Sequence, residues 1–178
     1  MIVYKLFFRH LVPPTPGGVL PAAKNLLTEA ECFSFFLTDE ILSKIVDYTN
    51  RYITALLQKV VELHGEDHLK KIRSKSPFIK TISLNDLKGF FGLMYHRAIY
   101  QWNHMSVYRF WNSNPIFCST MSLKRFYFMH RYIRFDDYET TVERWPQDRG
   151  TAIREIFELW NDRLAQAIQT GEVCMYKV

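Results

Sequence analysis

The chain has 178 residues, 48% of them hydrophobic and 16% aromatic, with a net charge of +5. This length and apolar content suit one domain with a buried core, or one domain plus a fragment of another, and exclude a disordered chain. The cysteines Cys32, Cys118 and Cys174 are odd in number and far apart, which excludes a disulfide framework or zinc motif and favours a reducing, intracellular compartment. No segment approaches the ~18 apolar residues of a membrane span, so no membrane partner is expected.

Residues 1–26 are predicted to be a poorly ordered leader. The breaker cluster Pro13–Gly18 separates them from the domain. The first ten residues resemble a signal peptide only briefly, because Arg9 and His10 interrupt the apolar run and no small-residue cleavage site follows.

Two start signals predict the first helices. Thr28 and Glu31 have the spacing of a capping box, which predicts a short helix through Phe36. Thr38 begins a long helix in which apolar residues recur every three or four positions, and Gly65 is expected to end it.

The basic segment 64–77 is predicted to be a polar connection or a frayed helix. Ser83 and Asp86 form a second capping-box signature, starting a helix that runs to about Gln101. Within that helix, Gly89 and Gly92 are expected to let a neighbouring backbone approach closely.

Ser106 and Ser122 are predicted to cap two further helices. After an acidic connection at 136–150, a helix is predicted over Thr151–Thr170. Val173–Val178 has the composition of a strand.

These elements predict an all-α fold with at most one short terminal β-strand. The helical domain is expected to cover residues 27–170, with about five or six helices. Residues 171–178 would hold the strand.

Charge is strongly segregated along the chain. Between residues 70 and 134 there are twelve basic residues and one acid, Asp86. A run this one-sided indicates a surface that faces a polyanion such as nucleic acid. The alternative is that these cations are simply the solvated faces of helices.

Aromatic residues interleave with the cations, as in KRFYFMHRYIRF at Lys124–Phe135. We expect the aromatic rings to fill the core and the cations to point outward toward phosphates. The residues expected to contact DNA are Lys70, Lys71, Arg73, Lys75, Arg97, Arg109, Lys124, Arg125, Arg131 and Arg134.

The remaining candidate sites favour structural roles. Asp136 and Asp137 are adjacent carboxylates that end a cationic helix, where capping or salt bridging is favoured over metal catalysis. His64 and His68 stand four apart but have no third ligand nearby. No catalytic residue, metal site or cofactor is predicted from these patterns.

Five segments, in order and spacing, resemble the N-terminal half of piggyBac-type transposases, and the likeness extends from about Leu27 to the end. These segments are FFLTDEIL (Phe35–Leu42), NHMS (Asn103–Ser106), MSLKRFYF (Met121–Phe128), YIRFDD (Tyr132–Asp137) and DRGTAIREIFELWN (Asp148–Asn161).

The resemblance implies a helical region that binds the transposon ends as duplex DNA, helps to pair two protomers as a homodimer and works in the nucleus. It also implies an RNase H-like core whose first strand aligns with Gly171–Val178, placing Lys177 where the first metal-binding Asp belongs and Val178 where a Glu follows. The other carboxylates and a zinc module would lie beyond this chain. We therefore expect no enzyme activity and no small-molecule substrate.

Three alternatives remain at this stage. A transposon remnant without function would have the same sequence features. A helical interaction module would bind an acidic protein in place of DNA. A longer product that restores the carboxylates would be an active transposase.

Overall fold

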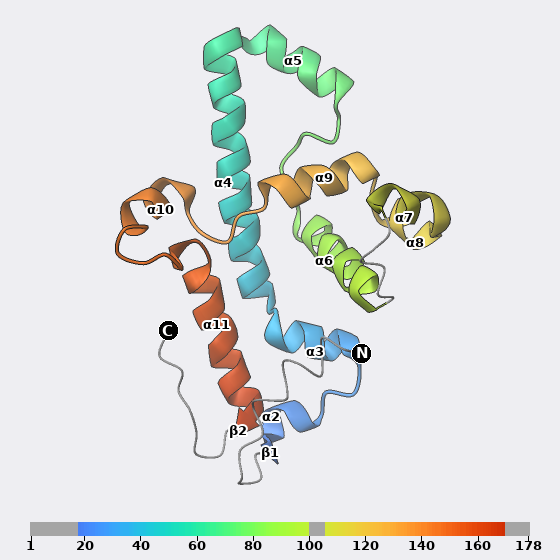
Figure 1. Ribbon diagram of the computed structural model, residues 1–178, viewed down its shortest axis with the longest axis vertical. Helices are drawn as coiled ribbons and strands as arrows, with labels where there is room; N and C mark the ends of the chain where they lie inside the picture. Colours follow the sequence, from blue (N-terminus) through green and yellow to red (C-terminus); the bar gives the residue numbers. More distant parts are fainter. Residues whose placement is uncertain (1–17, 100–105, 170–178) are drawn as a thin grey trace. The chain divides into compact units, whose positions relative to one another are not determined.

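The computed structural model describes residues 18–99 and 106–169 (Figure 1). The chain divides into two compact units. Of the described residues, the first unit holds 18–39 and 156–169, and the second holds 40–99 and 106–155.

The described residues are mainly helical, which confirms the all-α prediction. In chain order the elements are β1 (Gly18–Val19), α2 (Pro21–Lys24), α3 (Glu29–Phe36), α4 (Asp39–His64), α5 (Glu66–Lys75), α6 (Leu84–Ile99), α7 (Val107–Ser113), α8 (Pro115–Thr120), α9 (Leu123–Tyr132), α10 (Tyr138–Arg144), α11 (Thr151–Ala167) and β2 (Ile168–Gln169).

Strand structure in the described residues is limited to one antiparallel pair, in which β1 meets β2 through Gly18 with Gln169 and Val19 with Ile168. The strand predicted at Val173–Val178 lies outside the described residues. No helix of the described residues is long and apolar enough to cross a membrane.

The first unit contains the capping box that the sequence predicted. The hydroxyl of Thr28 accepts from the backbone N–H of Glu31 at 3.2 Å, and the Glu31 carboxylate accepts from the Thr28 N–H at 2.9 Å. The helix that follows, α3, ends at Phe36, whose ring centroid lies 6.1 Å from that of Trp160.

In the second unit α4 is the long helix of Figure 1. Its apolar stripe buries Ile41, Leu42, Ile45 and Ile53. Gly65 ends the helix with a φ of 81°, a left-handed conformation that costs glycine little.

The aromatic core of this unit lies among α6, α7, α8 and α9. The ring of Phe126 lies 5.1 Å from Phe90 and 4.8 Å from Trp111, and Trp111 lies 5.0 Å from Phe117. The indole N–H of Trp111 donates to the carbonyl of Met121 at 2.8 Å. These rings fill the interior, as the interleaved pattern predicted, whereas Tyr127 of the same pattern is 50% exposed.

Four local expectations need refinement. The basic segment after Gly65 is the regular helix α5, and the acidic connection contains the helix α10. A Cβ on Gly89 would meet the side chain of Thr120 at 3.1 Å, so the close neighbour there is a side chain. The close approach predicted at Gly92 is wrong, because a Cβ there would meet no atom within 4 Å.

Candidate nucleic-acid interface

Helix α5 carries four of the predicted DNA-contacting cations. Glu66 and Asp67 lie in its first turn, and Arg73 and Lys75 lie in its last, so both ends have the charge that the helix dipole favours. This distribution explains why a segment with little apolar content still forms a helix after Gly65.

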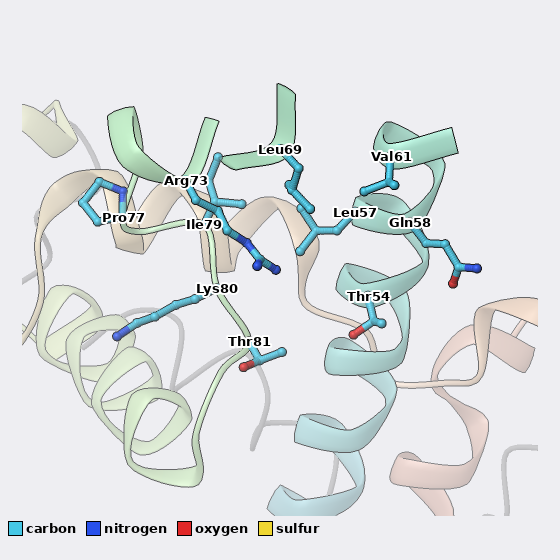
Figure 2. A pocket seen from close by; sticks show the side chains of 10 residues that line it. All are labelled: Thr54, Leu57, Gln58, Val61, Leu69, Arg73, Pro77, Ile79, Lys80 and Thr81. Atoms are coloured by element: carbon cyan, nitrogen blue, oxygen red, sulfur yellow. The ribbon is translucent and has the colours of Figure 1, made fainter. Parts of the chain in front are cut away.

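The less polar side of α5 faces α4 across a hollow of about 600 Å³. Leu69 and Arg73 of α5 line it together with Leu57 of α4 and Ile79 and Lys80 of the connection to α6. Figure 2 shows the Arg73 guanidinium pointing into this hollow, whereas the Lys80 ammonium points away from α4.

Arg125 of α9 holds that connection in place. Its guanidinium donates to the carbonyl oxygens of Phe78 at 2.8 Å, Lys80 at 2.8 Å and Thr81 at 2.9 Å. It also reaches the Asp86 carboxylate at 3.2 Å and is only 5% exposed.

The prediction that Arg125 contacts DNA therefore needs correction. The guanidinium is buried, and its two terminal nitrogens already donate to three carbonyl oxygens and a carboxylate, which leaves little of it accessible to a phosphate. Its role is structural, and we leave Arg125 out of the candidate interface.

Asp86 is the one acidic residue between positions 70 and 134. Partial burial raises the pKa of Asp86, but the hydrogen bonds from Ser83 and the positive charge of Arg125 outweigh it, so that pKa lies below its ordinary value. Its carboxylate also accepts from the Ser83 N–H at 3.0 Å, which completes the predicted capping box. Asp86 is thus ionised and occupied within the fold.

Three lysines line one hollow of about 410 Å³ together with Arg125 and Asp86, which pair with each other at 3.2 Å. Lys75 comes from the end of α5, Lys80 from the connection and Lys124 from the first turn of α9. Within the described part of the chain, none of the three pairs with an acid. We call these residues the lysine cluster.

Lys80 is the member that sequence reasoning left out. It is one of the twelve basic residues between positions 70 and 134, but it is not among the residues that the sequence predicts to contact DNA. It lies in the connection between α5 and α6, where no helical spacing relates it to other cations. Its neighbourhood with Lys75 and Lys124 arises from the Arg125 hydrogen bonds. No local sequence signal reveals that arrangement.

The other predicted cations occupy different surroundings. Arg131 is exposed and lies 5.7 Å from the Tyr132 ring, and the guanidinium of Arg134 lies 4.1 Å from the Tyr52 ring. Arg97 stacks on Phe110 at 5.5 Å, and Arg109 is exposed on α7. The hollow of the lysine cluster includes neither Arg97 nor Arg109.

Lys70 and Lys71 complete the cations of α5. Lys70 pairs with Asp67 at 3.1 Å on the exposed surface. Lys71 is exposed and has no acidic partner among the described residues.

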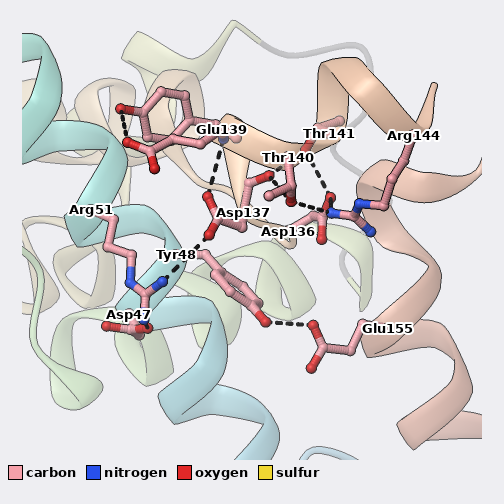
Figure 3. Close-up of polar contacts among 11 residues, drawn as sticks. Asp47, Tyr48, Arg51, Asp136, Asp137, Glu139, Thr140, Thr141, Arg144 and Glu155 are labelled. Atoms are coloured by element: carbon pink, nitrogen blue, oxygen red, sulfur yellow. Dashed lines mark hydrogen bonds and ion pairs between the residues drawn. The ribbon is translucent and has the colours of Figure 1, made fainter.

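The carboxylate pair Asp136 and Asp137 lies in a network of paired charges (Figure 3). Asp136 is buried and accepts from Arg144 and Thr141, both at 2.7 Å. Asp137 caps α10 by accepting from the N–H of Glu139 at 3.1 Å. The structural role predicted for this pair is confirmed.

Glu155, at the start of α11, belongs to the same network. It accepts from the ammonium of Lys44 at 2.7 Å and from the hydroxyl of Tyr48. These hydrogen bonds lower the pKa of Glu155. The bond to Glu155, together with burial, raises the pKa of Tyr48 to about 12.

The rings of His64 and His68 lie 4.9 Å apart. Among the described residues, no group of three or more histidine, cysteine or acidic side chains is placed to hold a metal ion.

Comparisons with known proteins show which family the chain is similar to. A protein family described as Transposase IS4 matches residues 28–176. A cryo-EM structure of the piggyBac transposase synaptic complex with hairpin DNA is similar to this chain, with a TM-score of 0.70 and 26% sequence identity. That match covers 88% of this chain and 30% of the other. No curated protein matches the chain.

Proposed function

This chain belongs to the Transposase IS4 family, and on that premise we propose that it binds the duplex DNA of transposon ends. The resemblance predicted from five sequence segments is confirmed by the family match and by the similarity to piggyBac transposase. The chain spans 30% of the length of the transposase chain that it matches. DNA binding is therefore proposed for the part of such a protein that this chain represents.

The lysine cluster is the observation that carries this proposal. Three lysines from three separate segments line one hollow, in which the Asp86 carboxylate is already paired with Arg125. Among the described residues, no acid neutralises Lys75, Lys80 or Lys124. Bringing like charges together costs free energy unless an anion joins them, and DNA phosphates supply anions at regular spacing.

The similar transposase was solved in a complex with hairpin DNA, which supports DNA as the polyanion. We extend the proposal to two properties that the resemblance implies, the pairing of two copies and a nuclear location.

The test is the binding of a fluorescein-labelled duplex, measured by anisotropy over a range of salt concentrations. Each neutralised phosphate should contribute about −0.9 to the slope of log affinity against log salt. Unlabelled polyglutamate serves as the competitor. Displacement of the labelled duplex at a lower charge concentration of polyglutamate than of unlabelled duplex would contradict the proposal and favour an acidic protein partner.

We also propose that this chain does not itself cleave DNA. In the resemblance, Lys177 occupies the position of the first metal-binding Asp, and a cation neither donates an oxygen to Mg²⁺ nor attracts it. The test is incubation of the purified chain with the duplex and Mg²⁺ or Mn²⁺. Reproducible nicking above a mock-purified control would contradict this second part.

A further inference from the structure

A second hollow of the second unit has a different chemical character. This groove of about 520 Å³ lies among α4, α5 and α9. Leu56, Leu57 and Val60 of α4 line it together with Tyr127 and Phe128 of α9. The α4 side chains are half-buried, and Tyr127 is 50% exposed. Phe128 is buried, with its ring centroid 6.4 Å from that of Phe78, so Tyr127 is the exposed apolar side chain of the groove.

The charged side chains that line the groove are both positive. Lys124 and Arg131 stand at its α9 edge, and both are exposed. Neither cation forms an ion pair with an acid in the described ranges. The groove therefore combines an apolar floor with a cationic edge.

Helical spacing produces this combination. Lys124, Tyr127, Phe128 and Arg131 stand at positions i, i+3, i+4 and i+7 of α9, so that one helix face has an aromatic centre and a cation at each end. An amphipathic helix presents anchors at the same spacing, which suits it to a groove between helices.

We propose that this groove binds an amphipathic helix of a partner protein, with acidic residues flanking the apolar stripe of that helix. The apolar residues would cover the floor formed by α4 and α9, and the acids would pair with Lys124 and Arg131. Duplex DNA does not meet both demands, because its phosphate backbone offers anions without a continuous apolar surface.

This proposal goes beyond DNA binding and does not depend on it. Lys124 belongs to both surfaces, since it lines the groove and the hollow of the lysine cluster. A helix in the groove should therefore weaken DNA binding by occupying Lys124.

The test uses the full chain and a fluorescein-labelled synthetic peptide of about 16 residues, with Leu at i, i+3, i+4 and i+7 positions and Glu at most others. We expect saturable binding in the micromolar range. One control peptide replaces Leu by Ser, and a second keeps Leu but replaces Glu by Lys. Each control should bind at least about tenfold more weakly.

Charge reversal on the protein sharpens the test. The double variant Lys124→Glu and Arg131→Glu should bind the acidic peptide more weakly than the wild type does. It should bind the lysine peptide more tightly. The matched control is Lys59→Glu with Arg149→Glu, which makes the same change in net charge at exposed sites outside the groove. This control should keep the preference for the acidic peptide.

A second variant, Tyr127→Ala, probes the floor and keeps the proposal falsifiable if the charge-reversed chain fails to fold. This substitution should lower the affinity for the acidic peptide by about tenfold. Three outcomes overturn the proposal: equal affinity for the Leu and Ser peptides, a charge-reversed variant that behaves like its control, and unchanged binding by Tyr127→Ala.

Discussion

The second unit has two charged regions, which differ in whether their charged side chains have partners within the chain. Around the first half of α4, α10 and Glu155, every acid labelled in Figure 3 has a hydrogen-bond or ion-pair partner within the chain. Around the end of α5 and the start of α9, the lysine cluster has no acidic partner among the described residues. The charges of the first region are paired within the chain, whereas the three lysines of the second region are available to an external anion.

The difference shows that charge becomes informative once its partners are known. A paired cation such as Arg144 stabilises the fold and offers little to a ligand. An unpaired cation such as Lys124 contributes little to the fold and remains available for binding. Substitutions in the two regions should therefore change different quantities.

The largest expected effect comes from Arg125→Ala. Arg125 is buried with four hydrogen-bond partners, so its loss leaves three carbonyl groups and Asp86 without their donor. We expect the free energy of unfolding to fall by about 3–5 kcal/mol in a urea titration. The neighbouring exposed variant Lys124→Ala should stay within about 0.5 kcal/mol. Equal effects of the two changes would remove the distinction between structural and binding cations.

A smaller loss is expected from Asp136→Ala in the paired region. This change removes the acceptor of Arg144 and Thr141, but Arg144 is 43% exposed and can turn to water. We expect the free energy of unfolding to fall by about 2 kcal/mol. The control Asp47→Ala breaks an exposed pair with Arg51 and should cost no more than about 0.5 kcal/mol. An Asp136 variant as stable as this control would contradict the structural role of the carboxylate pair.

The smallest effect should appear in acid. The pKa of Glu155 is lowered by its bonds to Lys44 and Tyr48, so its contribution to stability is present above the ordinary glutamate pKa and is lost as the pH falls through the lowered value. Because both ion-pair partners are more than a third exposed, the contribution near neutral pH should be about 0.5 kcal/mol. Chemical unfolding of Glu155→Gln between neutral and acidic pH should show a shallower loss of stability. The exposed Glu143→Gln is the control, and a Glu155→Gln curve parallel to the wild type would contradict the assignment.

Local signals predicted most of the fold. The Thr28 and Ser83 capping boxes, the stop at Gly65 and the long stripe of α4 are all short-range patterns, and the structure contains each of them. Helices α5 and α10 are harder to predict, because their segments are mostly polar and contain no buried residue.

The candidate interface depends on contacts between distant residues. Lys124 and Arg125 are neighbours in one basic run, yet Lys124 is exposed while Arg125 is buried against carbonyl groups more than forty residues away in sequence. Composition cannot separate the two residues. The carbonyl partners become visible only when the connection to α6 is placed beside α9.

The most direct test of the central claim compares two triple variants in duplex DNA binding over a range of salt concentrations. The first carries Lys75→Ala, Lys80→Ala and Lys124→Ala, and the second carries Lys24→Ala, Lys59→Ala and Arg149→Ala at exposed sites outside the cluster. If the lysine cluster binds phosphates, the first variant should lose roughly tenfold to hundredfold in affinity near 0.1 M salt and flatten the slope by about 2.7, while the second stays within about threefold of the wild type. Equal losses and equal slopes in the two variants would show that only net charge matters and would contradict the assignment of the lysine cluster as the DNA site.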